Sequence, residues 1–267
     1  MILFPNAKIN IGLNIVKRRG DGYHDLETVF YPIKIKDVLE VVEARELSFS
    51  SSGLAVPGRP ADNICLKAFA LLSRDMRLPM VKIHLHKNIP IGAGLGGGSS
   101  DASFFMKLMN EKFALGLTHE RMEEYASQLG ADCVFFIQNE PVFASEKGDK
   151  FEKIQLNLSK CFIVLVMPDV HVPTSQAFKD INPVPSVKSL KDLVKSDITN
   201  WKGSITNDFE SGIIKRYPSI GYIKDSLYNS GAIYASMSGS GSSVYGIFES
   251  SLKLPELEVA NRVFYGV

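Results

Sequence analysis

The sequence predicts an α+β protein built from two lobes. A chain of 267 residues is long enough for two packed cores. Apolar and polar residues alternate at 9–15 and 81–87, which is the period of strands with one buried face. Apolar residues recur at helical spacing over 102–113 and 118–129. Both kinds of element are therefore expected.

The boundary between the lobes is expected near residue 152. The chain becomes polar around Gly148–Glu152, and a fully apolar strand pattern begins at Cys161–Met167. We therefore expect an N-terminal lobe over 1–152 and a C-terminal lobe over 153–267.

The composition argues against two classes of partner. The formal net charge is +1, from 30 basic and 29 acidic residues, so we expect no nucleic acid and no membrane as partner. Cys65, Cys133 and Cys161 are widely spaced and form no metal-ligand pattern, which predicts reduced, mostly buried thiols and a cytoplasmic protein. The first residues lack the pattern of a signal peptide. The apolar run Phe162–Met167 is too short to cross a bilayer.

Lys8 and Asn10 share the polar face of the first strand pattern. A lysine in such a place is most often an exposed side chain at a sheet edge, and a functional lysine is the alternative. A turn is predicted at Arg18–His24, where Gly20 and Gly22 supply flexibility.

The stretch before the second strand is predicted to be less regular. Val38–Ala44 has the pattern of a strand, and Ser48–Gly53 that of a polar loop. Asp62 is predicted to cap a helix at 64–71. In the strand at 81–87, His84 and His86 share the polar face. They could bind a metal, but no third ligand lies at a convincing spacing, so a polar sheet surface is favoured.

A glycine-rich segment, Pro90–Asp101, has five glycines within seven residues and connects this strand to a helix. Glycine is favoured where φ is positive or where a side chain would prevent close approach. Backbone N–H groups of such a loop, together with the start of the next helix, can bind an anion. We therefore interpret the segment as a phosphate-binding loop, with Ser99 or Ser100 as the helix cap.

Three known glycine motifs do not fit this loop. A P-loop needs a lysine where Gly98 stands. A dinucleotide-binding fingerprint needs a second strand after the helix, whereas another helical pattern follows. A protein-kinase loop needs catalytic signatures that the chain lacks. A flexible linker is disfavoured because a strand and a helix flank the loop directly.

The next helix is predicted to begin after its N-cap Thr118 and to end before Gly130. Asp132 follows, at the entry to the apolar run Cys133–Ile137. Its carboxylate could belong to a solvated turn, could cap a helix, or could lie at the mouth of a cleft.

A second cluster of glycine and serine, Ser236–Ser243, precedes the strand pattern Val244–Phe248. Helices are predicted before it, at Leu190–Val194, Ile213–Tyr217 and Ile220–Tyr228. The two glycine clusters show no fixed repeat period. We therefore expect them to converge on one site rather than to form an array.

In their order, three segments resemble the motifs of the GHMP kinases, named for their galactose, homoserine, mevalonate and phosphomevalonate members. The segments are Pro5–Asn14, Pro90–Ala102 and Ser236–Tyr245. The resemblance covers nearly the whole chain. It implies a two-lobed GHMP kinase fold, with a lobe like ribosomal S5 domain 2 followed by a ferredoxin-like lobe. It also implies ATP and Mg²⁺ as cofactors, an ATP-binding and catalytic lobe at 1–152, and a substrate-binding lobe at 153–267.

Three further segments are similar to members of the family that phosphorylate the 2-hydroxyl of a cytidine-diphosphate-linked methylerythritol. They are Gly20–His24, Leu129–Asp132 and Val172–Phe178. One departure is Val134, where the family usually has proline, and it implies a changed turn beside Asp132.

The resemblance assigns roles to individual residues. Lys8 and Asp132 are implied to be catalytic: Asp132 would accept the hydroxyl proton, and Lys8 would keep that carboxylate ionised and stabilise the transferring group. The implied nucleotide-binding residues are Pro90, Ile91, Gly92, Ala93, Gly94, Leu95, Gly96, Gly97, Gly98, Ser99 and Ser100. The implied substrate-binding residues are Asn10, Tyr23, His24, Thr174 and Phe178. No pattern assigns metal ligands or an oligomeric state.

Three alternatives are weighed against this interpretation. A homoserine- or mevalonate-type kinase is disfavoured because Tyr23, His24 and Phe178 suit a flat pyrimidine. A non-catalytic nucleotide-binding sensor of the same fold is disfavoured by the presence of Lys8 and Asp132. An RNA-binding module is disfavoured by the neutral net charge.

Overall fold

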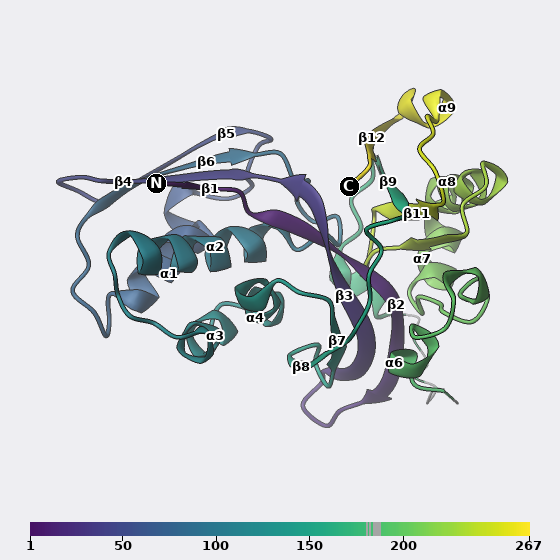
Figure 1. The fold of residues 1–267 in the computed structure, drawn as a ribbon, viewed down its shortest axis with the longest axis horizontal. Coiled ribbons are helices and arrows are strands. Elements are labelled where there is room, and N and C mark those ends of the chain that lie inside the picture. The colour runs from purple at the N-terminus through teal and green to yellow at the C-terminus, as the bar shows by residue number, and fades with distance from the viewer. Residues whose placement is uncertain (180, 182, 184–187) are drawn as a thin grey trace. The chain divides into compact units, whose positions relative to one another are not determined.

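The computed structural model describes residues 1–179, 181, 183 and 188–267 (Figure 1). Backbone contacts divide the chain into two compact units that alternate along the sequence. The first unit consists of Met1–Ala7, Ile35–Ile91 and Gly96–Glu140. The second unit consists of Lys8–Lys34, Gly92–Leu95 and Pro141–Val267. The glycine-rich segment therefore contributes to both units, and the division of function at residue 152 stays a prediction.

The first unit packs helices on one face of a sheet. The sheet has the strand order β1 (Ile2–Leu3), β4 (Val38–Glu43), β6 (Val81–Lys87) and β5 (Ser48–Gly53). Its helices are η1 (Pro60–Asp62), α1 (Ile64–Leu72), α2 (Gly97–Lys112), α3 (His119–Ser127) and α4 (Ala131–Gln138). Leu39 and Ile83 belong to the inward-facing residues of the strands, which join Leu72, Phe105 and Ile137 of the helices in one core. The predicted strands β4 and β6 are confirmed.

Ser48–Gly53 forms strand β5, so the predicted polar loop is wrong. Serine and glycine have little preference for strands, but parallel pairing with β6 overrides this. On the same face, the hydroxyls of Ser50 and Ser52 lie 2.9–3.0 Å from ring nitrogens of His84 and His86. The polar sheet surface is thus confirmed. No group of three His, Cys, Asp or Glu residues in the described ranges could hold a metal.

Two of the predicted helix ends are shifted. Asn63 caps α1 in place of Asp62, and its side chain accepts a hydrogen bond from the N–H of Cys65 at 2.9 Å. Thr118 caps α3 as predicted. Gly130 does not end α3 in the left-handed conformation: its φ is 163°, and it stands directly before α4. The backbone at Gly130 is therefore extended, and it does not adopt the left-handed conformation typical of a glycine that follows a helix.

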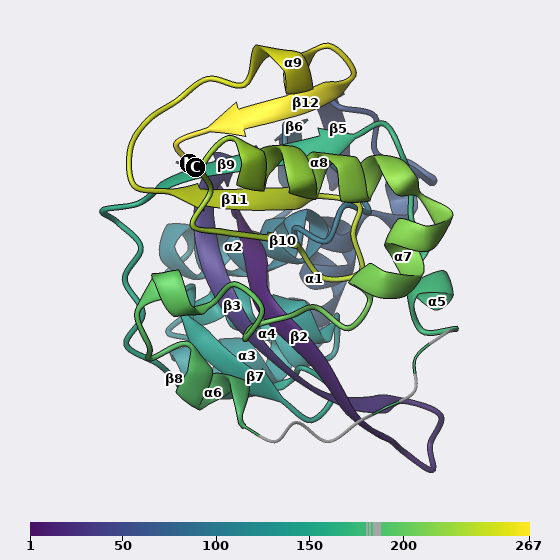
Figure 2. The ribbon, with the colours of Figure 1, turned by 90° about the vertical axis from the view of Figure 1, so that its right-hand side faces the viewer.

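The second unit contains two four-stranded sheets. One has the order β2 (Asn6–Arg18), β3 (His24–Lys36), β7 (Val142–Ser145) and β8 (Lys150–Lys153). Residues 6–7 of β2 and 35–36 of β3 belong to the first unit. The other is antiparallel, in the order β10 (Tyr234–Met237), β11 (Val244–Phe248), β9 (Phe162–Pro168) and β12 (Asn261–Tyr265). Figure 2 shows helix α8 (Pro218–Asn229) lying along this second sheet. The helices expected at 190–194, 213–217 and 220–228 are confirmed as α6 (Leu190–Leu193), α7 (Glu210–Arg216) and α8.

The remaining described helices of the second unit are short. They are α5 (Thr174–Ala177), η2 (Ile198–Asn200) and α9 (Pro255–Glu258). The core of the unit joins Leu13 and Ile15 of β2 to Val166, Ile223 and Leu227. Strand β2 is therefore held by this core along part of its length.

Strand β2 is buried on both faces over residues 6–13, which contradicts the predicted exposed polar face. Lys8 and Asn10 have only 4% and 3% of their surface exposed. The alternation of polar and apolar residues distinguishes two buried environments. The apolar face packs in the core, and the polar face packs against hydrogen-bonding groups of the same unit. Although β2 is the first strand in the order of its sheet, an exposed lysine is thus excluded at position 8.

The three cysteines are free thiols, as predicted. Cys65 and Cys133 are buried in the core of the first unit, and burial raises the pKa of both thiols. Cys161, directly before β9 in the second unit, is half-buried, and burial raises its pKa as well. A protonated thiol is a poor nucleophile, so the raised pKa values lower the reactivity of these groups in the folded chain.

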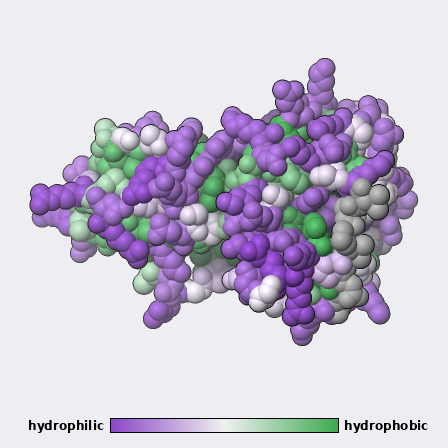
Figure 3. All heavy atoms as spheres, turned by 90° about the horizontal axis from the view of Figure 1, so that it is seen from below, coloured by the Kyte–Doolittle hydropathy of each residue, from purple (hydrophilic) through white to green (hydrophobic). Residues whose placement is uncertain are grey.

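The surface is mainly polar in the view of Figure 3, where hydrophilic side chains separate small apolar areas. The most exposed large apolar side chains, Tyr23, Tyr222 and Val259, come from different parts of the sequence. Among the described residues, none of the helices has the length and hydropathy needed to cross a membrane.

Candidate active site

Lys8 and Asn10 lie on β2 and contact each other. The Lys8 ammonium donates a hydrogen bond to Asn10 Oδ1 at 2.5 Å and lies 4.7 Å from the centre of the Phe30 ring. The backbone N–H of Lys8 donates to the carbonyl of Leu95 at 3.0 Å. The strand that carries the lysine is therefore bonded directly to the glycine-rich segment.

The two glycine clusters meet in the second unit, as predicted. The Ser238 hydroxyl donates to the carbonyl of Gly94 at 2.9 Å and accepts from the N–H of Asn10 at 3.1 Å. The N–H of Ser243 donates to the carbonyl of Ala93 at 3.3 Å. Gly94 has φ +77°, and a Cβ there would lie 2.0 Å from the Ser238 carbonyl oxygen. Only glycine permits this approach.

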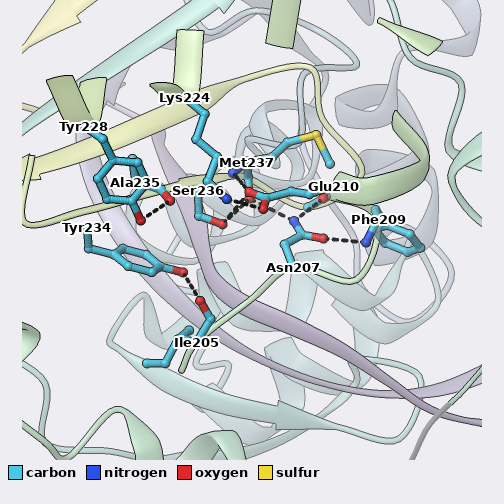
Figure 4. Close-up of polar contacts among 11 residues, drawn as sticks. Ile205, Asn207, Phe209, Glu210, Lys224, Tyr228, Tyr234, Ala235, Ser236 and Met237 are labelled. Carbon is cyan, nitrogen blue, oxygen red and sulfur yellow. Dashed lines mark hydrogen bonds and ion pairs between the residues drawn. The ribbon is translucent and has the colours of Figure 1, made fainter. Parts of the chain in front are cut away.

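Two buried polar side chains hold the second cluster from its other side (Figure 4). Asn207 donates to the carbonyls of Met237 and Gly239 at 2.9 and 2.8 Å. Glu210 accepts from the N–H of Met237 at 2.7 Å, and Lys224 forms an ion pair with it at 2.5 Å. Backbone groups at the start of the loop are thus fixed by an amide and a carboxylate.

The remaining part of the glycine-rich segment begins helix α2 in the first unit. Gly96 precedes the helix with φ +68°, so Ser99 and Ser100 lie in its first turn and do not cap it. The predicted serine cap is wrong because the N-cap is Gly96, three or four residues earlier than expected. Free N–H groups and the positive end of the dipole are still present at this terminus.

Gly97 and Gly98, at the start of α2, differ in how much space the fold leaves for a side chain. A Cβ at Gly97 would lie 2.8 Å from Ile89 Cγ2 and 3.0 Å from Lys87 Nζ, so this glycine permits close packing on β6. A Cβ at Gly98 would meet nothing within 4 Å, and the residue is exposed. The folded protein therefore gives no steric reason for glycine at 98. Ser100 is fully buried, and its hydroxyl has no partner among the described residues.

A buried ion cluster fixes the chain on both sides of the loop. Lys87 at the end of β6 is paired with Asp37 and, at 2.6 Å, with Asp101 in α2. Asp37 also accepts from the N–H groups of Asn88 and Ile89 at 2.6 and 2.7 Å. The segment before the loop and the first turns of the helix after it are thereby joined.

Burial and the paired charges shift two pKa values in this cluster. Burial raises the pKa of Asp101 to about 8, with the neighbouring Asp37 charge adding to the rise and Lys87 opposing it. Burial lowers the pKa of Lys87, but its two carboxylate partners outweigh this and the net pKa is raised. The ammonium therefore stays charged, while Asp101 holds a proton more readily than an ordinary aspartate.

Asp132 lies in the first turn of α4, in the first unit, and is half-buried. A negative side chain is favoured at this end of a helix. Its neighbour Val134, which departs from the family pattern, is part of the same helix and packs against the core of the first unit. The carboxylate is therefore carried by a regular helix, not by a solvated turn.

The residues implied to bind substrate all lie in the second unit. Tyr23 is 63% exposed in the turn between β2 and β3. The rings of His24 and Phe178 are stacked, with centroids 4.9 Å apart, and Phe178 also meets Phe209 edge to face. The hydroxyls of Thr174 and Ser240 lie 3.2 Å apart. The structure thus joins His24 to Phe178, and Thr174 to the second glycine cluster.

Sequence reasoning missed several polar residues of these networks. Lys87 and Asp37 continue the inward-facing alternation of Ile83, Leu85 and Leu39, so strand period alone could have marked both as buried charges. Asn207 and Glu210 left no such signal, because Glu210 is the first residue of α7, Asn207 lies just before that helix, and polar residues are common in both places.

The comparisons with known proteins agree along the chain. The family model described as the GHMP kinases N terminal domain matches residues 63–140, and that described as GHMP kinases C terminal matches residues 189–264. A 4-diphosphocytidyl-2-C-methyl-D-erythritol kinase of Bacteroides thetaiotaomicron is 49% identical over 99% of this chain and 98% of its own length. One from Bacteroides fragilis is 50% identical over 97% of this chain and 96% of its own length.

Solved structures give the same result. A crystal structure of 4-(cytidine 5′-diphospho)-2C-methyl-D-erythritol kinase matches with a TM-score of 0.79 and 26% identity, covering 100% of this chain and 98% of that one. The mevalonate kinase of Methanococcus jannaschii shares the fold, with a TM-score of 0.67 at 15% identity over 99% and 97% of the two chains. The chain belongs to the GHMP kinase family, and the expected α+β fold of that family is confirmed.

The raised pKa of Asp101 predicts how stability changes with pH. Between an ordinary aspartate pKa of about 4 and the folded value of about 8, the native chain keeps a proton that the unfolded chain has lost. The contribution of this group is therefore complete at low pH and is lost as the pH rises to 8. Asp101→Asn cannot lose a proton, so its free energy of unfolding should fall less than that of the wild type between pH 5 and 8.5. Urea unfolding at both pH values checks this, and equal pH dependence in the two proteins would contradict it.

The variant Gly98→Ala tests whether glycine at this position serves ligand binding or folding. The added methyl meets no protein atom, and alanine favours a helix by about 1 kcal/mol over glycine, so stability should not fall. If a phosphate approaches this position, KM for ATP should rise by about tenfold or more. The control Gly97→Ala should lower the melting temperature, because its methyl meets Ile89. An unchanged KM for ATP in Gly98→Ala would remove this residue from the nucleotide site.

Proposed function

We propose that this chain is a kinase that transfers the γ-phosphoryl group of ATP to the 2-hydroxyl of 4-diphosphocytidyl-2-C-methyl-D-erythritol. The observation that carries the proposal is the identity of about half of all residues, over nearly the full length, with kinases of that name. The local geometry supports it, since the strand that carries the buried Lys8 is hydrogen-bonded to the glycine-rich loop. The bond runs from the N–H of Lys8 to the carbonyl of Leu95.

The nucleotide would bind through Pro90–Ser100. Phosphoryl transfer depends mainly on neutralising charge and on placing the reacting groups in line. Backbone N–H groups at the start of α2 and the open space at Gly98 suit phosphate oxygens. We propose Mg²⁺ as a cofactor that enters with ATP. Mg²⁺ is usually held by the phosphates and one or two protein oxygens, and the unpartnered Ser100 hydroxyl and the neighbouring Ser99 are suitable donors.

Lys8 and Asp132 are proposed to act on the reacting groups. Asp132 would accept the proton of the attacking hydroxyl, since a carboxylate in the first turn of a helix is held in place by regular structure. The Lys8 ammonium would stabilise the negative charge of the transferring phosphoryl group. Asn10 uses one amide hydrogen and one lone pair inside the protein, and its second hydrogen could bind the substrate.

The cytidine group would be recognised in the second unit. Tyr23 and Phe178 are proposed to contact the flat ring, and His24 and Thr174 to hydrogen-bond to its edge. The exposure of Tyr23 supports this, because a 63% exposed tyrosine is not a core residue. Phe178 also packs against Phe209, so this side chain would contribute both to the fold and to binding. We further propose a cytoplasmic location, which is compatible with the free cysteines.

An acceptor panel tests the proposed reaction. ATP consumption should be stimulated by the cytidine-diphosphate ester of methylerythritol and not by homoserine or mevalonate. Phosphorus NMR of the product should show a new monophosphate ester on the erythritol. Turnover with mevalonate or homoserine and none with the cytidine ester would overturn the substrate assignment.

Asp132→Asn is the matched variant for the same assay. The amide keeps the shape of the side chain but cannot accept the proton, so kcat should fall by about 10²–10⁴-fold while both substrates still bind. A folded variant with the kcat of the wild type would exclude Asp132 as the base.

Tyr23→Ala tests the cytidine contact with little effect on the core. Loss of stacking on a base costs about 1–3 kcal/mol, so KM for the cytidine substrate should rise by about 5–150-fold. KM for ATP and the melting temperature should hardly change, because Tyr23 is exposed. Equal increases in both KM values would show that Tyr23 does not recognise the cytidine group.

A further inference from the structure

Thr28 on β3 binds the end of the Asn10 side chain that does not contact Lys8. The Thr28 hydroxyl donates to the carbonyl of Gly12 at 2.6 Å, and it accepts from Asn10 Nδ2 at 2.9 Å. Asn10 Oδ1 then accepts from the Lys8 ammonium at 2.5 Å. Lys8, Asn10 and Thr28 are all buried, with at most 4% of each exposed. The three side chains thus form one continuous series of hydrogen bonds.

The direction of this series follows from its first member. A carbonyl oxygen can only accept, so the single proton of the Thr28 hydroxyl is committed to Gly12. The hydroxyl can then only accept from Asn10, which must present its NH₂ group to Thr28 and its oxygen to Lys8. The opposite orientation of the amide would place two donors, the NH₂ group and the ammonium, against each other.

The carbonyl at the start of the series has a fixed direction. Gly12 has φ +67°, and a Cβ there would lie 2.7 Å from Leu190 Cδ1 and 2.8 Å from Ile205 Cγ2. The backbone is therefore confined by packing on one side and by a conformation that favours glycine. Its carbonyl offers Thr28 a constant acceptor.

We propose that Thr28 is a positioning residue for Lys8 in phosphoryl transfer. The inference rests on the proposed function, in which the Lys8 ammonium stabilises the transferring group. Without the Thr28 hydroxyl, Asn10 Nδ2 loses its acceptor. The amide that accepts from the Lys8 ammonium is then no longer fixed at its other end, so the two side chains can shift together. A displacement of about 1 Å in a catalytic group can lower the rate by about 10²-fold.

The backbone of Asn10 is held by other groups, which separates positioning from folding. Its N–H donates to Ser238 Oγ at 3.1 Å, and its carbonyl accepts from the Tyr245 hydroxyl at 2.9 Å. Both bonds are independent of Thr28. Removal of the hydroxyl should therefore leave the Asn10 side chain less firmly held and leave β2 in place.

Thr28→Val and Thr28→Ser form the test pair. Valine keeps the size of threonine and removes the hydroxyl, so kcat should fall by about 10- to 100-fold while KM for ATP stays within about threefold. Serine keeps the hydroxyl, so kcat should remain within about threefold of the wild type. The matched control is Tyr31→Phe, which removes another hydroxyl of β3, one that accepts from the N–H of Leu158. Its kcat should equal that of the wild type.

Lys8→Ala, measured in parallel, distinguishes the two possible failures. If Lys8→Ala is inactive and folded Thr28→Val has the kcat of the wild type, the positioning role is wrong and the role of Lys8 stands. If Lys8→Ala keeps full turnover, the catalytic role of Lys8 is wrong and the inference falls with it. A loss of kcat in Thr28→Ser equal to that in Thr28→Val would also overturn the inference. Should Thr28→Val fail to fold, Thr28→Ala removes the same hydroxyl and is judged by the same values.

Discussion

The close approach of Gly94 to Ser238 is the contact on which the arrangement of the candidate site in the second unit depends. It requires a residue without Cβ on one side, because any other would overlap the Ser238 carbonyl. On the other side, one hydroxyl serves both the Gly94 carbonyl and the N–H of Asn10. Since buried backbone groups need partners, this hydroxyl stabilises two segments at once. Strand β2, which carries Lys8, is thereby joined to both glycine clusters.

In the first unit, a buried ion cluster holds another part of the glycine-rich segment. An ammonium in a core is tolerated only when it is paired, and Lys87 has two carboxylates in place of one. Desolvation and the second negative charge act on Asp101, whose pKa rises as a consequence. The cluster joins the end of β6 to helix α2. Neutral hydrogen bonds in one unit and a buried ion cluster in the other therefore fix different parts of the same glycine-rich segment.

Much of the fold could be predicted because periodic patterns report burial directly. The alternation of β4 and β6, the helical stripe of α2 and the Thr118 cap are local signals, and each is confirmed. Strand β5 was missed because its serines gain their stability from pairing with β6, which is a long-range property. The burial of Lys8 was missed for a related reason, since alternation shows that two faces differ and does not show that one is solvated. The meeting of the two glycine clusters could be predicted from chemistry, whereas Asn207, Glu210 and Thr28 are recognised only from their partners in space.

The distribution of the cysteines gives the molecule two internal reporters of opening. Cys65 and Cys133 lie in the first unit with raised pKa values, and Cys161 lies in the second. Because a thiol reagent attacks the thiolate, the two buried sulfurs become fast to label only when the core of the first unit opens to water, whereas the half-buried Cys161 serves as the more accessible reference. Labelling followed by peptide mass analysis would therefore time the loosening of the first unit in the natural sequence, without any introduced probe. The same sulfurs would record whether a bound nucleotide slows that opening.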